Sequence, residues 1–529
     1  MNNVRYILLI IFLCFTTTLF GQAPAIQWKK CFGGSGNDIG LTIVESPTGG
    51  YFVAGHTESH DGDVQSNNGL GNVWLVRIDT TGNITWEKSY GGSFGYESAY
   101  DMQMTNDGGL IIVGEASSND GNVTGYHSGS GPDIWVVKTD SSGNLLWQKC
   151  LGGAQSETGS EIIETMDGNY ILIGTTESLS GDGDLSFVHS PPDTWVVKLD
   201  NIGNIIWEKT FGGYDLDFGN SILEGDTNEF YLCTTSSSLD SFVLGNHGEQ
   251  DILVTKINST QNIIWQKNFG GSSNEYIGNI YFDSNYKLRI NANTESNDFD
   301  ITNFNGSADI WGLIIDSTNL LSSRCFGGNG HDNVHSSHIT FNDGTIIAGH
   351  SNSSSLQSNC LNTFMYDYFI LKLDSLGNFE WSKCLGGSAD DVANDAIPTS
   401  DGGYIAVGST ESNDYDVSGN HGGKDMWVVK LAPAGVNVPE LSAAITDFTT
   451  FENSNGALHL NFSAEASASL KLSLFDLTGR EVFSEKYSCI SGMNSHNTSA
   501  LSLSPGIYVL QLSDGEGMMV KKIFVNGRN

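Results

Sequence analysis

An internal repeat limits what this chain of 529 residues can fold into. Segments of the type WEKSYGG recur seven times, and their aligned positions are separated by 58, 61, 60, 58, 57 and 59 residues. Segments of the type DIWVVK also recur seven times, once in each period. A fixed period of this kind indicates repeated structural units that bury their apolar faces against one another.

Each period contains four runs typical of strands. In the second copy these runs are 97–105, 109–117, 133–140 and 144–153. Short turns of Asn, Asp, Ser and Gly join the first run to the second and the third to the fourth, which is the chemistry of β-hairpins. Two hairpins make a four-stranded antiparallel sheet, and a ring of such sheets packed face to face is a β-propeller.

The two ends of the repeat region predict that the ring is closed. The region begins with a lone fourth-run segment, 27–34, and ends with a lone third-run segment, 425–431. If the first run of each repeat is innermost, the N-terminal strand completes the last sheet as its outer strand. We therefore predict an all-β fold, in which residues 22–431 form a seven-bladed β-propeller closed by an N-terminal strand.

All eleven Trp residues fall on two aligned positions of the repeat. We expect them in the core, with indoles of neighbouring blades stacked on one another and none left to contact a ligand. The eleven are Trp28, Trp74, Trp86, Trp135, Trp147, Trp195, Trp207, Trp265, Trp311, Trp381 and Trp427.

The repeat resembles the bacterial SBBP-type β-propeller repeat. The resemblance is carried by CFGGSGNDIGLTIVESPTGGYFVAGHTES (31–59) and NVWLVRIDTTGNITWEKSYGGS (72–93), and it extends over residues 26–431. The hairpin WVVKLDNIGNIIW (195–207) also resembles the tryptophan-docking turn of quinoprotein dehydrogenase propellers. No cofactor or metal constellation accompanies that turn.

The N-terminus has the pattern of a signal peptide. An apolar stretch of about 15 residues, from Tyr6 to Phe20, precedes small and polar residues. It is shorter than the ~20 residues that a membrane span needs. We expect residues 1–21 to be removed near Gly21, and the mature chain to be exported without a transmembrane segment.

A second domain follows the repeats. Residues 432–440, APAGVNVPE, predict a linker, and alternating apolar runs in 441–529 predict a small Ig-like β-sandwich. This tail resembles the C-terminal sorting domain of the Bacteroidetes type IX secretion system. The matching residues are Leu474, Phe475, Asp476, Gly479, Arg480, Leu503, Pro505, Gly506, Tyr508, Lys521, Lys522, Ile523 and Val525.

That resemblance implies the type IX secretion machinery as a partner. It also implies that the protein is secreted or anchored on the extracellular side of the outer membrane. An ordinary Ig-like adhesive module is the alternative for the tail.

Charge and cysteine content exclude other classes. The formal net charge is −37, which repels phosphate backbones, so we expect no nucleic-acid partner. Seven cysteines remain after signal removal. Cys31, Cys150, Cys325 and Cys384 share one aligned position, which Ser, Thr or Asn occupies in the other copies. That variation indicates a small residue and not a disulfide.

The long connections between the second and third runs repeat a pair of Asp, or Asp and Asn, at i and i+2. This spacing suits oxygen ligands of Ca²⁺, although a third Asp and a distal Glu are missing. Asp and Asn also form side-chain turns with their own backbone, and both interpretations stay open. The candidate ligands are Asp61, Asp63, Asp120, Asp182, Asp184, Asp298, Asp300, Asp414 and Asp416.

An Asp two residues before the aligned position of the third run recurs in six of the seven copies. In several copies His or Asn precedes it by four residues. Because catalysis rarely needs six identical sites, we predict a structural acceptor for loop amides at the strand entrance. These residues are Asp133, Asp193, Asp251, Asp309, Asp367 and Asp425.

No enzyme motif stands out. HExxH, CxxC and GxxxxGK[ST] are missing from the sequence. We predict a binding or adhesion module that recognises extracellular glycans or proteins through the face of the long loops, with no certain cofactor. The alternative is an extracellular carbohydrate-active hydrolase or lyase, which an asymmetric axial pocket lined by carboxylates unique to one blade would favour.

Overall fold

The computed structural model describes residues 23–433, except 68, 128, 227, 241–242, 244, 355–359 and 361–363, and the tail segments 445–452, 458–464, 467–475, 481–498, 506–513 and 518–525. The predicted signal peptide and most of the predicted linker lie outside the described residues. The chain forms two compact units, 1–434 and 435–529. All regular elements of the described residues are β-strands, so the all-β prediction is confirmed.

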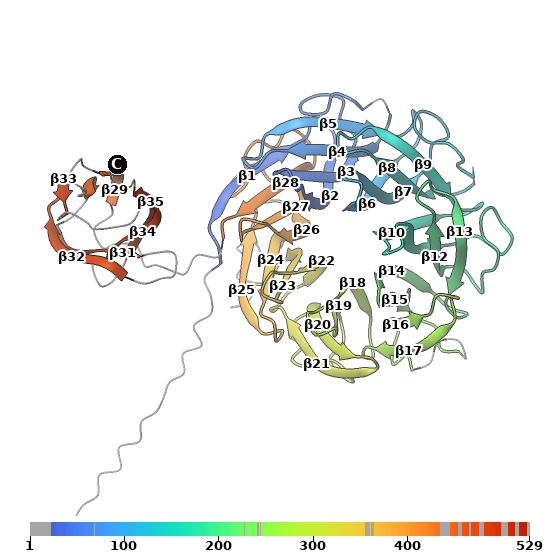
Figure 1. The fold of residues 1–529 in the computed structure, drawn as a ribbon. Helices are drawn as coiled ribbons and strands as arrows, with labels where there is room; N and C mark the ends of the chain where they lie inside the picture. The colour runs from blue at the N-terminus through green and yellow to red at the C-terminus, as the bar shows by residue number, and fades with distance from the viewer. Residues whose placement is uncertain are drawn as a thin grey trace, which may run out of the picture. The chain divides into compact units, whose positions relative to one another are not determined.

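The larger unit consists of four-stranded antiparallel sheets arranged around a ring, which is a propeller-like fold (Figure 1). Its described residues form seven such sheets, which we number in chain order. From the inner to the outer strand, the sheets contain β2 (Asp38–Glu45), β3 (Tyr51–Thr57), β4 (Asn72–Ile78) and β5 (Ile84–Tyr90); β6 (Glu97–Met104), β7 (Leu110–Ala116), β8 (Asp133–Thr139) and β9 (Leu145–Leu151); β10 (Glu157–Glu164), β11 (Tyr170–Thr176), β12 (Asp193–Leu199) and β13 (Ile205–Phe211); β14 (Asp217–Glu224), β15 (Phe230–Ser236), β16 (Asp251–Ile257) and β17 (Ile263–Phe269); β18 (Glu275–Phe282), β19 (Leu288–Thr294), β20 (Asp309–Asp316) and β21 (Asn319–Phe326); β22 (Asp332–Ile339), β23 (Thr345–Ser351), β24 (Asp367–Leu373) and β25 (Phe379–Leu385); and β26 (Asp391–Pro398), β27 (Tyr404–Thr410), β28 (Asp425–Leu431) and β1 (Ile26–Phe32).

The hairpin turns have the predicted chemistry. In the first sheet, Oδ1 of Asp79 accepts the amides of Thr81 (2.8 Å) and Asn83 (2.9 Å). Gly82 follows with a φ of 80°. Glycine adopts this left-handed conformation more easily than other residues, so it allows the chain to reverse direction here. Such turns fix the strand register, because turn length sets which residues pair across the hairpin.

The N-terminal strand joins the two ends of the ring. β1 pairs with β28 in the antiparallel register from Trp28↔Lys430 to Phe32↔Met426. On the other side of this sheet, β27 contacts β2 of the first sheet. The first and last repeats are therefore held together by backbone hydrogen bonds as well as by side-chain packing.

The apolar core lies between neighbouring sheets. One cluster, for example, combines Phe52 and Leu75 of the first sheet with Leu110, Ile112 and Trp135 of the second. The third-strand indoles at Trp74, Trp135, Trp195, Trp311 and Trp427 are buried. Each sheet has two apolar faces and needs a neighbour on both, so closure removes two faces that would otherwise meet water.

The outer-strand indoles do not stack on other indoles as predicted. In the described part of the unit, the ring pairs that involve Trp join it to Tyr or Phe, such as Trp147 with Tyr170 (5.9 Å). Trp147 also lies against Gly203 of the next sheet, where a Cβ atom would be 2.9 Å from its ring. The outer strand faces the turn of its neighbour, so glycine leaves the room for the indole.

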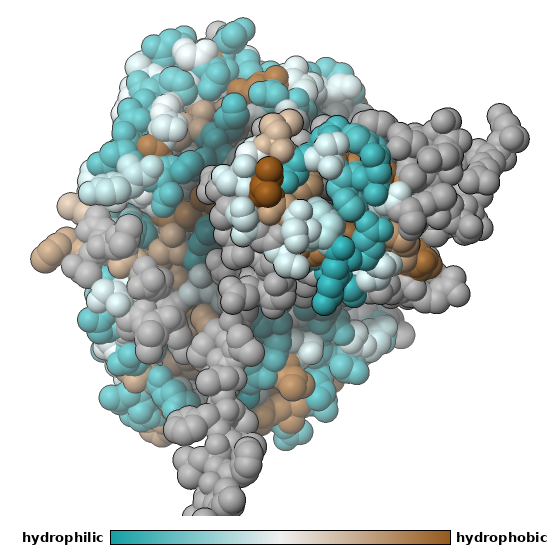
Figure 2. All heavy atoms as spheres, turned by 90° about the vertical axis from the view of Figure 1, so that its left-hand side faces the viewer, coloured by the Kyte–Doolittle hydropathy of each residue, from teal (hydrophilic) through white to brown (hydrophobic). Residues whose placement is uncertain are grey.

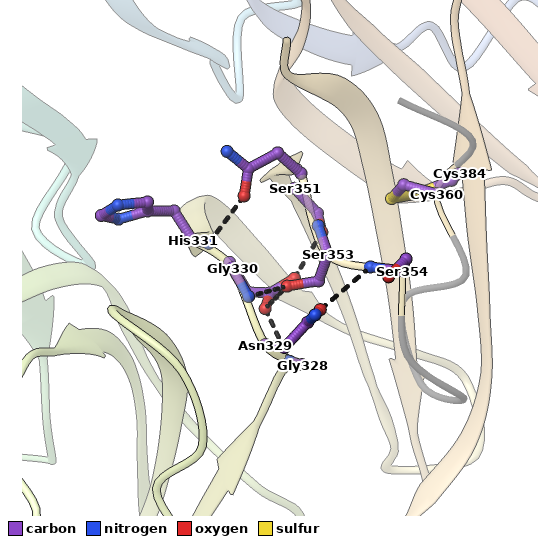
Figure 3. The surroundings of a disulfide bond; sticks show 11 residues. Gly328, Asn329, Gly330, His331, Ser351, Ser353, Ser354, Cys360 and Cys384 are labelled. Carbon is purple, nitrogen blue, oxygen red and sulfur yellow. Dashed lines mark hydrogen bonds between the residues drawn. A yellow bond between two sulfur atoms is a disulfide. The ribbon is translucent and has the colours of Figure 1, made fainter. Parts of the chain in front are cut away.

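In the first, third and sixth sheets, the small residue on the outer strand ties the long loop to the sheet. Thr210 donates its hydroxyl to the carbonyl oxygen of Phe187 (2.7 Å), and Ser66 donates to Ser89 (3.1 Å). In the sixth sheet Cys384 forms a disulfide with Cys360, with 5.2 Å between the Cα atoms (Figure 3). The prediction that Cys384 is not bridged is therefore wrong. Cys360 lies outside the repeat register, so alignment of the repeats gives no sign of it.

The smaller unit contains two antiparallel sheets that share one apolar core. One sheet has the order β29 (Ile445–Glu452), β30 (Leu458–Ala464) and β33 (Gly492–Asn497). The other has the order β32 (Glu481–Cys489), β31 (Ala468–Phe475), β34 (Gly506–Ser513) and β35 (Met518–Val525). Leu460 and Phe462 of the first sheet pack with Leu472, Leu474 and Leu510 of the second.

Candidate functional site

The long connections and the segments that enter each inner strand lie at one end of the sheets, which we call the loop face. The long connections are 58–71, 117–132, 177–192, 237–250, 295–308, 352–366 and 411–424. The opposite end carries tight turns, such as the one closed by the amide of Ser46 and the carbonyl of Gly50 (2.9 Å). A rigid ring therefore presents its variable segments on the loop face.

The loop carboxylates predicted as Ca²⁺ ligands accept backbone amides. Oδ1 of Asp61 accepts the amide of Ser35 (2.7 Å), and Oδ2 of Asp63 accepts that of Gly33 (3.3 Å). The bonds from Ser35 lower the pKa of Asp61. Equivalent bonds join Ser93 to Asp120 (2.7 Å), Ala154 to Asp182 (3.0 Å), Gly152 to Asp184 (3.4 Å), Ser272 to Asp298 (2.8 Å), Gly270 to Asp300 (3.3 Å) and Ser388 to Asp414 (2.8 Å), and Lys29 lies 3.5 Å from Asp416.

A cation at these loops stays a prediction. Among the described residues, the only group of three or more candidate ligands within 4.8 Å of one another is Cys360, Asp367 and Cys384. Two of these three residues form the disulfide. The loop carboxylates belong to no such group within the described ranges.

At the entrance of five third strands, an Asp accepts an amide from its own loop. Oδ2 of Asp193 accepts the amide of His189 (2.7 Å). The same bond occurs at Asp133 with His127, at Asp251 with His247, at Asp309 with Asn305 and at Asp425 with His421. Asp367 occupies the equivalent place on β24. This arrangement holds each loop at the start of the strand.

A second carboxylate from the next sheet faces each of these residues. A Cβ atom on Gly212 would lie 2.9 Å from Oδ1 of Asp193 and 2.7 Å from Oδ2 of Asp217, so both carboxylates meet beside this glycine. Oδ1 of Asp193 is buried and has no hydrogen-bond partner among the described residues. Burial and the charge of Asp217 raise the pKa of Asp193 to about 7. We call such a pair an inter-sheet acid pair.

The acid pairs recur around the ring with one exception. The others are Asp133 with Glu157, Asp251 with Glu275, Asp309 with Asp332, Asp367 with Asp391, and Asp425 with Asp38. In the first sheet Asn72 replaces the Asp. When its side-chain amide is oriented to satisfy the surrounding acceptors, Nδ2 donates to Oε2 of Glu97 (3.0 Å) and to the carbonyl oxygen of Gly92 (3.2 Å). The sequence pattern found one carboxylate of each pair but not the other, because the partner belongs to the next repeat.

Exposed aromatic side chains gather on the loop face, and the sequence analysis missed them. They are Phe94, Tyr96, Phe187, Tyr214, Phe299, Phe364 and Tyr415. Aromatic residues between turn-forming residues, away from the two Trp positions, would have been the signal. Elsewhere, the face of the molecule seen in Figure 2 is mostly hydrophilic, with small separate hydrophobic patches.

A groove of about 350 Å³ lies on the loop face between the third, fourth and fifth sheets. Phe218 and Tyr276 supply aromatic rings, and Asn220 and Gln250 supply amides. The remaining lining residues are Ser156, Thr158, Ser160, Thr175, Glu177, Gly219 and Thr235. Rings beside hydroxyl, amide and carboxylate groups can hold a ligand that has both apolar faces and many hydroxyl groups.

The groove continues into a cavity of about 470 Å³ on the axis of the ring. Ser160 and Asn220 line both spaces. The cavity is lined by the inner strands, each of which has a bulge that turns one more residue toward the axis. The residue just after each bulge is polar: Thr42, Asp101, Glu161, Ser221, Asn279, Ser336 and Asp395.

These axial side chains connect neighbouring sheets. Oδ2 of Asp101 accepts the amide of Ile162 (3.0 Å), and Oε2 of Glu161 accepts that of Ile222 (2.7 Å). Oδ2 of Asp395 accepts the amide of Ile43 (3.0 Å) across the closure of the ring. Inner-strand amides have no strand beside them on the axis, so carboxylates take the place of a neighbouring strand.

The pKa values of the axial carboxylates are shifted in different directions. Burial raises the pKa of Asp101 to about 6, and burial together with the charge of Asp101 raises the pKa of Glu161 to about 8. Burial acts to raise the pKa of Asp395 as well. The positive charge of His338 and its hydrogen bond to Asp395 (2.9 Å) outweigh this effect, so the pKa of Asp395 is lowered. Only the second, third and seventh sheets carry an acid at this position, so the cavity is asymmetric. The alternative enzyme prediction named carboxylates unique to one blade, whereas these acids come from three sheets.

Comparison with known proteins assigns the smaller unit. Residues 454–526 match the secretion system C-terminal sorting domain. This chain carries a type IX sorting tail. The tail marks proteins that are exported by this system to the cell surface or the extracellular space, so the predicted location is confirmed. In the part of the chain that the structure describes, no helix has the length and apolar character of a membrane span.

Comparison of the whole chain gives only distant similarities. No curated protein matches it. A polysaccharide lyase of the ulvan lyase family PL25, solved with a bound saccharide, is 12% identical over 76% of this chain and 96% of its own, with a TM-score of 0.45. Sqt1 from Chaetomium thermophilum is 11% identical over 78% and 100%, with a TM-score of 0.37. A puromycin hydrolase is 9% identical over 73% and 60%, with a TM-score of 0.33. The SBBP-type resemblance of residues 26–431 stays a prediction.

Proposed function

We propose that this chain is a secreted seven-bladed β-propeller with an Ig-like sorting tail, and that it binds neutral extracellular glycans on its loop face. The observation that carries the proposal is the groove that contains Phe218, Tyr276, Asn220 and Gln250. Aromatic rings stack on the apolar face of a pyranose, while amide and hydroxyl groups bond its hydroxyls.

The charge of the protein selects among glycans. A net charge of −37 repels uronate and sulfate groups, so a neutral polysaccharide suits the loop face better than an anionic one. Repeated units of such a ligand can also contact several sheets of the ring at once. Weak contacts then add up to firm attachment, which is what an adhesion module needs.

The test is affinity electrophoresis of the mature full-length protein in gels that contain neutral glucans, xylan or mannan, with alginate as the anionic comparison. We expect a neutral polysaccharide to retard the protein and Tyr276→Ala to weaken binding about tenfold. Tyr286→Ala is the matched control, because Tyr286 lies in the tight turn at the other end of the same sheet and is also exposed. Failure of every polysaccharide to retard the protein would contradict the proposal and favour a protein ligand.

A second candidate is hydrolysis of a glycosidic bond in the axial cavity. Two carboxylates with different proton affinities, Asp101 and Glu161, line this cavity. Glu161 would protonate the leaving oxygen while Asp101 removes a proton from the attacking water. A lyase is less suited, since lyases act on uronates, which the charge of the protein repels.

The measurement is the release of reducing ends from the polysaccharides that the protein binds. Hydrolysis predicts release by the wild type and loss in Glu161→Gln and Asp101→Asn. The control is Thr42→Ala, because Thr42 lines the same cavity from the first sheet and carries no carboxylate. A wild type that binds without releasing reducing ends would leave binding as the function.

A further inference from the structure

Five long loops share the same turn on the loop face, and its central residue has a positive φ in each. The values are 64° at Gly62, 62° at Gly121, 54° at Gly183, 51° at Phe299 and 50° at Tyr415. In this left-handed region glycine is favoured, and a bulky residue is a genuine outlier. Phe299 and Tyr415 therefore occupy positions for which the fold prefers glycine.

The preference has a steric cause. A Cβ atom on Gly62 would lie 2.3 Å from the carbonyl oxygen of Gly33, and one on Gly183 would lie 2.0 Å from that of Gly152. In the Gly183 copy, the amide of the next residue donates to this carbonyl at 2.9 Å. In the Phe299 copy, the equivalent bond from Asp300 to Gly270 lengthens to 3.3 Å. In the Tyr415 copy, the equivalent bond from Asp416 to Gly386 is 3.0 Å, so the contact is kept in both aromatic copies and is longest beside Phe299.

Burial does not offset this cost. Phe299 is 64% exposed and Tyr415 is 81% exposed. One face of the Phe299 ring stacks on His247 of the neighbouring loop, with 4.8 Å between centroids and 28° between planes. Most of each ring remains open to solvent. Backbone strain at side chains that stay largely exposed is characteristic of ligand-binding positions.

The surroundings of the rings indicate the ligand class. In the sequence each aromatic residue is flanked by two Asp residues, Asp298 and Asp300 or Asp414 and Asp416. One oxygen of Asp298 and of Asp414 accepts an amide. Carboxylate oxygens beside a flat ring suit the hydroxyls and the apolar face of a neutral sugar. They disfavour an anionic polymer.

We propose that Phe299 and Tyr415 are the sugar-stacking residues of the loop face, and that each binds one pyranose ring of a neutral glycan. This inference rests on the proposed function. It adds two contact points to the groove, on the fifth and the seventh sheets, so that one extended glycan or several chains can contact the ring at separate places.

The experiment replaces each ring by glycine and by alanine in the full-length protein. Phe299→Gly and Tyr415→Gly remove both the ring and the backbone strain, whereas Phe299→Ala and Tyr415→Ala remove the ring alone. We expect all four to weaken binding of the polysaccharide that retards the wild type by about tenfold each. The Tm of the glycine variants should equal or exceed that of the wild type, and the alanine variants should melt below their glycine counterparts.

The control is Phe341→Ala, because Phe341 is equally exposed but lies in a tight turn at the opposite end of the sixth sheet. Glycine variants that bind as the wild type does, while Tyr276→Ala does not, would overturn this inference and leave the proposed function intact. Glycine variants with a lower Tm would assign the rings to the fold and overturn it as well. A wild type that binds no polysaccharide would remove the proposed function and this inference together.

Discussion

Asparagine in place of Asp193 should make the protein more stable at alkaline pH, with a smaller effect at acid pH. Asp193 and Asp217 form an inter-sheet acid pair, and Oδ1 of Asp193 is buried without a partner among the described residues. The first sheet already contains the replacement, since Asn72 donates its amide to Glu97 there. Asp193→Asn therefore copies an arrangement that the fold accepts.

The magnitude follows from the pKa. Burial raises the pKa of Asp193 from 3.8 to about 7, so between these values the folded protein holds a proton that the unfolded chain has lost. The unfolded state then binds fewer protons, and stability falls as the pH rises through this range. The full difference corresponds to a ceiling of about 4 kcal/mol, and we expect roughly half of it, because Asp217 and His189 can adjust.

The assay is urea denaturation of the wild type and Asp193→Asn at pH 5, 7 and 9. Because pH 5 already lies above the unfolded pKa of 3.8, the variant should be more stable by a little under about 1 kcal/mol at pH 5 and by about 2 kcal/mol at pH 9. The control is Asp200→Asn, in a turn of the same sheet, where hydrogen bonds from Asn204 lower the pKa of Asp200. This substitution should therefore reduce the stability at neutral and alkaline pH, which is the opposite of the effect expected for Asp193→Asn. A constant difference between wild type and Asp193→Asn at all three pH values would refute the reasoning.

Three further perturbations test other contacts. Cys360→Ser should lower the free energy of unfolding by about 3 kcal/mol, because the disulfide closes a loop of 24 residues. A reductant should lower the free energy of unfolding of the wild type to the same value. A wild-type unfolding transition that does not respond to reductant would contradict this. Deletion of residues 23–34 should expose the edge of β28 and cause aggregation, so a monomeric, cooperatively unfolding deletant would count against closure by β1. If the loop carboxylates hold Ca²⁺, EDTA should lower the Tm and added Ca²⁺ should restore it, whereas an unchanged transition would leave backbone amides as their only ligands.

The sequence predicted the features that repeat, because periodic apolar runs and turn residues report strands directly. The pairing of 27–34 with the last repeat followed from a lone fourth run at the N-terminal end and a last repeat that lacks its own fourth run. Features that depend on contacts between repeats were not predicted. Asp217 faces Asp193 across a sheet boundary, and the indole of Trp147 meets a turn glycine of the next sheet and not another indole.

The candidate site was predicted only in part. The loop face was identified from loop length, but the axial cavity was not, because a bulge such as the one between Gly159 and Glu161 changes which residue faces the axis. Phe299 and Tyr415 were not predicted as ligand contacts. Their positive φ has no signature in the sequence beyond the glycines that replace them in other copies.

The pairing of β1 with β28 also dictates an order of assembly. The strand that leaves the ribosome first is the last to find its place, since its partner is made only after all the other sheets. Until β28 has been made, β1 and its Trp28 stay unpaired in the nascent chain. The long sequence separation makes this final step slow, so a chaperone that shields the early strand would raise the yield of folded cargo.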